Sequence, residues 1–262
     1  MKFDYVSKRT LLTVCLAFGI TLFMFAFAGN RQSDMTAVFS SPADSKVIVI
    51  DPGHGGFDSG AVSPSGIRED ELNLKVALKL EKYLSEHNAT VILTRETNES
   101  LASRKSEDMR KRVQIIRDSN PDIVVSIHMN KFPQSQYFGA QTFYMEGSEE
   151  GKRLAQCIQT KLLENLIEGN KRQIKAASNL LILKAGSAPA VIVECGFLSN
   201  PREESLLITD EYQDKAAWSI FCGILEYFAN EETFYWDRIQ TPYTNLADKP
   251  LNSINCYNYQ KV

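Results

Sequence analysis

The sequence has no large excess of charge of either sign. It contains 29 Lys and Arg against 32 Asp and Glu in 262 residues, and the two signs are interspersed along the chain. DNA or RNA binding needs a basic patch or stripe, so nucleic acid is excluded as an expected partner. With 44% hydrophobic residues and no internal repeat, the composition is that of an ordinary globular protein, long enough for one sizeable core or two small ones.

Cysteine is scarce. Cys15 lies within an apolar run, and Cys157, Cys195, Cys222 and Cys256 are scattered without a C-x-x-C pair, which argues against a zinc ribbon. Four cysteines allow three disulfide pairings, among which the sequence cannot choose. Because a domain of this size can do without disulfides, we expect buried free thiols.

Nucleotide-binding motifs are also missing. Gly53, Gly55, Gly56 and Gly60 form a glycine-rich loop, but their spacing does not fit G-x-G-x-x-G, and no G-x-x-x-x-G-K-[ST] is present. The sequence therefore does not predict a phosphate-binding role for this loop.

One long apolar run occurs, at the N-terminus. A basic segment ending at Arg9 precedes the uncharged run Leu11–Ala28, and Arg31 follows it. This pattern predicts an export signal with an A-x-A-like cleavage site at its end. The run also reaches the minimum length of a membrane-spanning helix, so residues 1–29 are either a signal peptide or a membrane anchor. In both cases we expect an exported protein, either secreted or anchored on the extracytoplasmic side.

The remaining chain divides into three segments. Residues 30–45 lack periodicity and are rich in small polar residues, which predicts a linker. Residues 46–230 are predicted to form one compact domain. Residues 231–262 hold several aromatic residues without a clear helical or alternating pattern, so we expect a tail that is extended over the domain or mobile, with a docking strip for a partner as the alternative.

Within the compact domain, predicted strands and helices alternate. Short β-branched or apolar runs predict strands at 46–50, 89–94, 122–127, 139–145, 180–183 and 190–193. Helical spacing predicts helices at 72–88, from a cap at Ser103 to a stop before Asn120, at 154–166 and at 218–228. This alternation predicts an α/β fold with helices on both faces of a sheet.

The three histidines differ in their placement. His54 follows the first predicted strand directly, and His128 ends the third. Ligands and catalytic groups of open α/β sheets gather at the carboxyl ends of strands, so both histidines stand where a site is expected. His87 lies among polar residues at the end of a predicted helix, and we expect it to be solvated.

A catalytic zinc ion commonly has three protein ligands of the N or O type and one open position for water. Glu69 and Glu71 both open the first predicted helix, close to the loop that carries His54. Two histidines and one glutamate would leave a net charge of about +1 on Zn²⁺, enough to polarise a carbonyl. The spacing alone does not choose between the two glutamates.

Glu194 directly follows the β-branched residues Val191–Val193 and therefore ends a buried strand. Charged residues are seldom placed there without a partner. Its structural interpretation is a helix cap or a salt bridge, and its functional interpretation is a general base that takes a proton from water.

These motifs resemble the zinc-dependent N-acetylmuramoyl-L-alanine amidases of the amidase-3 family. Five segments in family order carry the resemblance: Ile48–Gly56, Gly66–Glu69, Leu93–Glu96, Val125–Asn130 and Val193–Asn200. The resemblance implies a single α/β domain with a central, mostly parallel sheet flanked by helices, so that residues 46–230 would be the zinc amidase catalytic domain.

The resemblance also implies the chemistry. Zn²⁺ would be bound by His54, Glu69 and His128, with Glu194 as the catalytic carboxylate and Glu71 as a surface neighbour. The substrate would be peptidoglycan, cut at the amide between the lactyl group of N-acetylmuramic acid and L-alanine. Some control, for example by an activator protein, is expected, but the sequence identifies none.

Within the family, the chain looks most similar to the germination-specific amidases of endospore-forming bacteria, through Ser103–Val113, Tyr212–Lys215 and the lack of a wall-binding repeat. In that subgroup, stem removal resembles the first step towards muramic-δ-lactam in the spore cortex, which implies a place in the intermembrane space between forespore and mother cell. Two alternatives remain: a non-catalytic peptidoglycan-binding or activator protein, and another wall zinc hydrolase such as an endopeptidase or deacetylase.

Overall fold

The computed structural model describes residues 41–240, with side chains for residues 41–230. Within this range the strands are β1 (Val47–Pro52), β2 (Thr90–Leu93), β3 (Ile123–Asn130), β4 (Gln141–Met145), β5 (Lys175–Ala177) and β6 (Ala190–Phe197). The helices are α2 (Glu69–Ser85), α3 (Lys105–Ser119), α4 (Glu149–Asn165), α5 (Pro201–Leu207) and α6 (Asp210–Gln240), with a 3₁₀ turn η1 (Ile182–Lys184). The predicted single α/β domain is confirmed.

The strands form one mixed sheet in the order β2-β1-β3-β6-β4-β5. All neighbouring pairs are parallel except β4 with β6, which is antiparallel. The central strands β1, β3 and β6 are β-branched runs buried on both faces, as strands of parallel sheets commonly are. Their carboxyl ends share one edge of the sheet, where the loops after β1 and β3 begin.

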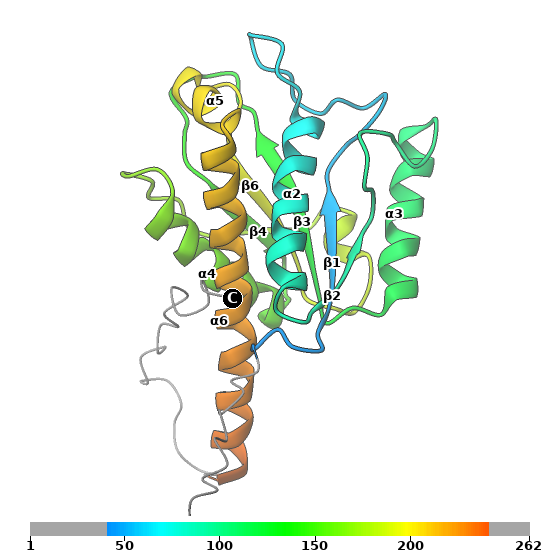
Figure 1. The fold of residues 1–262 in the computed structure, drawn as a ribbon, viewed down its shortest axis with the longest axis vertical. Helices are drawn as coiled ribbons and strands as arrows, with labels where there is room; N and C mark the ends of the chain where they lie inside the picture. The colour runs from blue at the N-terminus through cyan, green and yellow to red at the C-terminus, as the bar shows by residue number, and fades with distance from the viewer. Residues whose placement is uncertain (1–40, 241–262) are drawn as a thin grey trace, which may run out of the picture. The chain divides into compact units, whose positions relative to one another are not determined.

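Helices cover both faces of the sheet. Ile48, Ile50 and Val125 lie in the larger apolar cluster with residues of α2, α4 and α6. Val49 and Val124 point the other way, into a smaller cluster with residues of α3 and η1. In Figure 1, α2 and α6 run side by side across the front of the sheet. The sheet is thus packed between two layers of helices, which hold the carboxyl ends of its central strands in place.

Several predicted elements need correction. The predicted strand at 180–183 is wrong, because these residues enter η1, where Ile182 and Leu183 are buried against the sheet. The short edge strand β5 and the helix α5 were not predicted. Ser103 does not cap α3, whose N-cap is Arg104 without a side-chain cap. Finally, α6 continues through residues 231–240, where no helix was predicted.

The cysteines within the described residues agree with the prediction. Cys157, Cys195 and Cys222 are free and buried. Cys15 and Cys256, the predicted signal or anchor at 1–29, most of the linker and residues 241–262 lie outside the described part of the chain.

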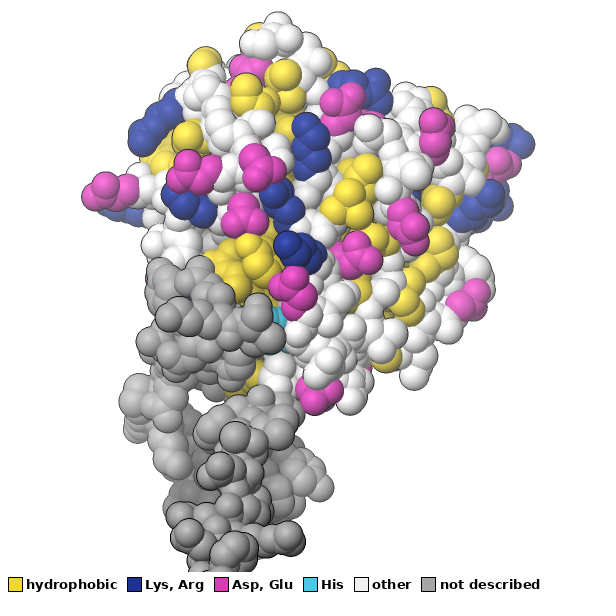
Figure 2. Space-filling view, viewed as in Figure 1, with side chains coloured by type: hydrophobic (Ala, Val, Ile, Leu, Met, Phe, Trp, Pro, Cys, Tyr) yellow, Lys and Arg dark blue, Asp and Glu magenta, His cyan; other side chains and the backbone are white. Residues whose placement is uncertain are grey.

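Among residues 41–240, no helix combines the length and the apolar character that a membrane crossing requires. On the face seen in Figure 2, acidic and basic side chains of the described region lie interspersed.

Candidate metal centre and its surroundings

Three residues lie next to one another at the carboxyl edge of the sheet. His128 of β3 pairs in register with Glu194 of β6, so both side chains leave the same face about 4.8 Å apart. On the other side of His128, the backbone N–H of Gly53 donates to the carbonyl oxygen of Ile127 (3.0 Å) and extends β1 past its last strand residue. A Cβ on Gly53 would overlap the imidazole ring of His128, so the glycine provides the space that this ring occupies.

Two arginines hold the backbone of the loop that carries His54. Arg95 donates to the carbonyl oxygens of Pro52 (2.9 Å) and Gly53 (3.0 Å), and Arg112 donates to those of Pro52 (2.7 Å) and His54. His54 has a φ of 61°, in the left-handed region that non-glycine residues seldom adopt. The carbonyl contacts stabilise this turn, which aims the imidazole across the edge of the sheet.

Buried partners fix Arg112 itself. Its guanidinium contacts Asp51 (2.8 Å) and Asp108 (2.6 Å). Asp51 also accepts hydrogen bonds from Thr94 (2.6 Å) and Ser126 (2.7 Å). Burial alone would raise the pKa of Asp51, but Arg112 and these hydroxyls lower it below its usual value. A buried ionic network therefore supports the loop from beneath.

A carboxylate orients the His54 ring. Asp58 lies 3.0 Å from Nδ1 of His54 and 2.9 Å from the ammonium of Lys105, at the start of α3. Burial raises the pKa of Asp58, but the bonds to Lys105 and His54 outweigh it and lower the pKa to about 2. With Nδ1 engaged, Nε2 is the ring nitrogen that faces the site.

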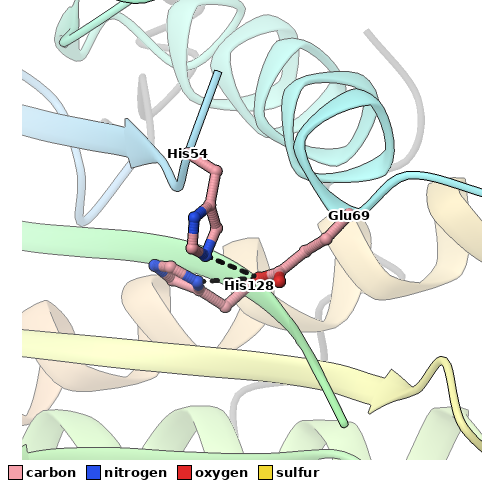
Figure 3. Close-up of side chains that lie close together, drawn as sticks. All are labelled: His54, Glu69 and His128. Atoms are coloured by element: carbon pink, nitrogen blue, oxygen red, sulfur yellow. Dashed lines mark hydrogen bonds and ion pairs between the residues drawn. The ribbon is translucent and has the colours of Figure 1, made fainter. Parts of the chain in front are cut away.

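Glu69 reaches both imidazoles from the start of α2, as Figure 3 shows. Its Oε1 lies 3.3 Å from Nε2 of His54 and 2.9 Å from Nδ1 of His128, while its Oε2 accepts from the N–H of Ala61 (2.7 Å). One ligand atom from each of the three residues lies within 4.8 Å of the others. Ligand atoms about 2.1 Å from a tetrahedral zinc ion are about 3.4 Å apart, so the cluster has the size and the donor types to hold a metal ion.

The short distances within the cluster shift the pKa values of Glu69 and His128. Burial raises the pKa of Glu69, but hydrogen bonds from His128 and His54 lower it well below its usual range. Burial lowers the pKa of His128, yet the partner Glu69 raises it above its usual value. The negative charge of Glu69 and a positive charge on His128 therefore stabilise each other.

Glu194 lies beside this cluster without joining it. Its Oε2 is buried and has no hydrogen-bond partner among the described residues, so neither the salt bridge nor the cap considered for it is formed. Burial and the nearby Glu69 raise the pKa of Glu194 to about 7, while His128 and His54 act to lower it. A carboxyl group with this pKa can both accept and donate a proton near neutrality.

The other candidates lie away from the centre. Glu71 is exposed and 3.7 Å from Arg68. His87 is not solvated as predicted: only 8% of it is exposed, and its ring packs 4.7 Å from that of Phe221 on α6. Sequence reasoning missed Asp58 and Arg112. Asp58 carried a signal, since it is an acidic residue four positions after a ligand-type histidine, whereas Arg112 lies far along a charged helix.

Comparisons with known proteins indicate a family for this chain. Residues 48–226 match the family model Amidase_3, described as N-acetylmuramoyl-L-alanine amidase. The chain is 39% identical over 233 residues to the germination-specific N-acetylmuramoyl-L-alanine amidase of Bacillus subtilis, covering 86% of this chain and 97% of that one. It is 34% identical to the amidase LytC of the same organism, of which it covers only 40%.

Among solved structures, the CwlD amidase of Clostridioides difficile, in complex with the GerS lipoprotein, is similar with a TM-score of 0.69 and 39% identity. That match covers 71% of this chain and 100% of CwlD. The catalytic domain of CwlV from Bacillus (Paenibacillus) polymyxa is similar with a TM-score of 0.63 and 33% identity, over 70% of this chain and 98% of that one.

Proposed function

Because this chain belongs to the amidase-3 family of N-acetylmuramoyl-L-alanine amidases, we propose that His54, Glu69 and His128 hold a catalytic zinc ion and that Glu194 is the proton-transferring group. The protein is an amidase that acts on peptidoglycan. The observation that supports these roles is the register of β3 and β6, which sets Glu194 beside the three ligand-type side chains.

The choice of metal follows from the donors. Two imidazole nitrogens and one carboxylate oxygen form the kind of set that catalytic zinc sites use, with a fourth position left for water or substrate. A zinc ion held there would polarise the lactyl carbonyl and lower the pKa of a water molecule to about 7. Asp58 would keep Nδ1 of His54 engaged so that Nε2 stays directed at the ion.

In this proposal Glu194 transfers the proton, first as a general base and then as a general acid. It accepts a proton from the water whose oxygen attacks the lactyl carbonyl carbon. When the C–N bond breaks, it returns that proton to the amine of L-alanine. Its pKa near 7 suits both roles. The products are a lactyl carboxylate on the glycan and a stem peptide with a free N-terminus.

The roles are tested by separating metal binding from turnover. Glu194→Gln is expected to lower turnover by about 10²–10⁴-fold and to leave zinc affinity nearly unchanged, because this residue is proposed only as the proton-transferring group. His128→Ala should lose both. Turnover is followed by mass spectrometry of muropeptides, and zinc affinity by competition with a chromophoric chelator. Wild-type turnover in Glu194→Gln would refute the mechanism.

The same digest separates the reaction classes. Stem peptides that start at L-alanine, together with stem-free glycan, are the expected products. Shortened stems would indicate an endopeptidase, and released acetate a deacetylase. Zinc binding without any product would favour a non-catalytic wall-binding protein.

We further propose that the substrate is spore cortex peptidoglycan, where stem removal prepares muramic-δ-lactam. The identity to the germination-specific amidase and the likeness to CwlD support this role. Spores that carry Glu194→Gln as the only copy of the protein should lack muramic-δ-lactam, while their vegetative wall is unchanged. Normal lactam content in such spores would remove the cortex assignment.

Wall amidase relatives imply an extracytoplasmic or wall-associated place for the protein. We propose that residues 1–29 direct this export, and that a lipoprotein contacts the domain, as GerS does with CwlD. Fractionation of cells with an antibody against the domain tests the first point. Co-purification of a lipoprotein with the tagged full chain from sporulating cells tests the second.

A further inference from the structure

His128 and Glu194 lie in a row across the carboxyl ends of β3 and β6, and this row continues onto β4. On the side of Glu194 away from His128, β4 runs antiparallel to β6, and Gln141 is the residue in register with Glu194. The amide of Gln141 donates to the carbonyl oxygen of Gln173 (2.8 Å), in the segment that leads into β5. Gln141 therefore links the row to this segment.

Arg172 lies at this end of the row. Its Nη1 donates to Oε1 of Gln141 (3.2 Å), and its Nε donates to the carbonyl oxygen of Phe138 (2.7 Å). Its guanidinium lies over the ring of Phe197, 4.4 Å from the centroid, and Phe197 is three residues beyond Glu194 on the same strand. These contacts with Phe138, Gln141 and Phe197 thus hold the half-buried cation of Arg172 beside the β4 end of the row.

The charge of Arg172 is not matched by a salt bridge. Among the described residues no carboxylate forms an ion pair with its guanidinium, although Glu203 is close enough to be affected by its charge. The two oxygens of Glu203 are taken by the backbone N–H groups of Gly139 and Phe197. The two hydrogen bonds of Arg172 use two of the five N–H groups of a guanidinium, so donors remain for an anion from outside.

The stem peptide presents such an anion at the matching distance. In peptidoglycan, L-alanine is followed by a D-glutamate that is linked onward through its side chain, which leaves its α-carboxylate free. From the lactyl carbonyl carbon to this carboxylate the extended path is roughly 7 Å, given about 3.8 Å between successive α-carbons. Neighbouring strands are about 4.8 Å apart, so a carbonyl held beside Glu194 places the carboxylate just past Gln141, where Arg172 lies.

We propose that Arg172 binds the free α-carboxylate of the second stem residue, and that this contact orients the scissile amide over Glu194 and the metal centre. The inference rests on the proposed amidase function and adds a specificity for acidic stems. A guanidinium recognises a carboxylate through charge-assisted and often bidentate hydrogen bonds, which an uncharged amide cannot match.

The test compares two peptidoglycan preparations, one with the free α-carboxylate at the second stem residue and one in which this group is amidated. The wild-type protein should cleave the acidic form with a kcat/KM about 10- to 100-fold higher, the range of a charge-assisted hydrogen bond. Arg172→Gln should lose this preference by losing rate only on the acidic form. Arg172→Lys, which keeps the charge, should restore part of the preference.

Lys171→Gln is the matched control, because it removes the same charge from the neighbouring exposed residue and should keep the wild-type preference. Thermal unfolding and zinc affinity of each variant show whether the domain and metal centre are intact. No preference in the wild-type protein, equal loss of rate on both forms in Arg172→Gln, or an undiminished preference in that variant would each overturn the assignment. A wild-type protein that binds zinc but cleaves neither form would instead refute the proposed amidase function.

Discussion

Gly53 offers the sharpest test of how the metal centre is built. It lies at the end of β1, where a Cβ would come within 2.7 Å of Nδ1 of His128, the atom that faces Glu69. Ordinary contacts of a Cβ begin at 3.4 Å. The φ of Gly53 is not in the left-handed region, so alanine fits the backbone there. Gly53→Ala should therefore displace the His128 ring without unfolding the loop.

The expected size of the effect follows from these distances. The nearest ring atom, Cε1, would lie 2.2 Å from the Cβ, so relieving the overlap moves the rigid ring by about 1.2 Å, whereas metal–ligand distances tolerate about 0.2 Å. Substitutions that only disturb the support of a ligand cost about 10- to 100-fold in metal affinity. Because Gly53→Ala shifts a ligand atom itself, we expect at least about 100-fold weaker zinc binding, or about 2.7 kcal/mol.

The assay is a zinc titration against a chromophoric chelator, combined with thermal unfolding of the metal-free protein. Gly186→Ala is the matched control, because a Cβ there meets nothing within 4 Å and the φ of Gly186 is not in the left-handed region. The control should bind zinc like the wild type. Wild-type zinc affinity in Gly53→Ala would refute the packing of His128 against Gly53. An equal loss of zinc affinity in Gly186→Ala would refute it too.

Three other predictions follow from the same contacts. Asp58→Ala should weaken zinc binding about 10- to 100-fold by freeing the His54 ring, measured with the same chelator. Lys105→Ala should weaken it less, because the ammonium of Lys105 pairs with Asp58 and acts on the ring through that carboxylate. Asp51→Asn should lower the free energy of unfolding by about 3–5 kcal/mol. Because the pKa of Asp51 is lowered in the folded state, the stability difference between wild type and variant should be largest above the unfolded-state pKa. It should shrink as pH falls below about 4 towards the folded-state pKa. Urea unfolding at several pH values measures this difference, and a pH-independent difference would contradict the prediction. Leu80→Ala should cost about 2–5 kcal/mol in the metal-free protein and leave zinc affinity unchanged, since Leu80 is fully buried in the larger core; a loss below about 1 kcal/mol would contradict this packing.

The ends of the central strands could be predicted from sequence because their signals are local. His54 and His128 each follow a β-branched run, and such runs end at one edge of a parallel sheet. Spacing alone did not choose between Glu69 and Glu71; the family resemblance favoured Glu69, and the geometry of α2 supplies the physical reason. In α2 a step of two residues rotates the side-chain direction by about 200°, given 3.6 residues per turn, so the two side chains point to nearly opposite sides of the helix. As a result, only Glu69 faces the histidines, while Glu71 is exposed.

Other features depended on contacts between distant segments. His87 lies among polar neighbours in sequence, but Phe221 of α6 covers its ring. The apolar run from Leu180 to Leu183 has the composition of a strand, yet its buried members fill the space beneath β6 as a 3₁₀ turn. Arg112 contacts Asp51 across 61 positions of the chain, a pairing that no local pattern contains.

The position of β6 in the sheet also determines which part of the chain completes the proposed site. Among residues 41–240 it is the last strand in sequence, yet it lies between β3 and β4. A chain synthesised only as far as β5 already has His54, Glu69 and His128, but neither Glu194 nor the strand against which Gln141 is registered. The proposed site is thus complete only when β6 is inserted between β3 and β4. If Glu194 is the proton-transferring group, a chain truncated before β6 is therefore expected to have no hydrolytic activity.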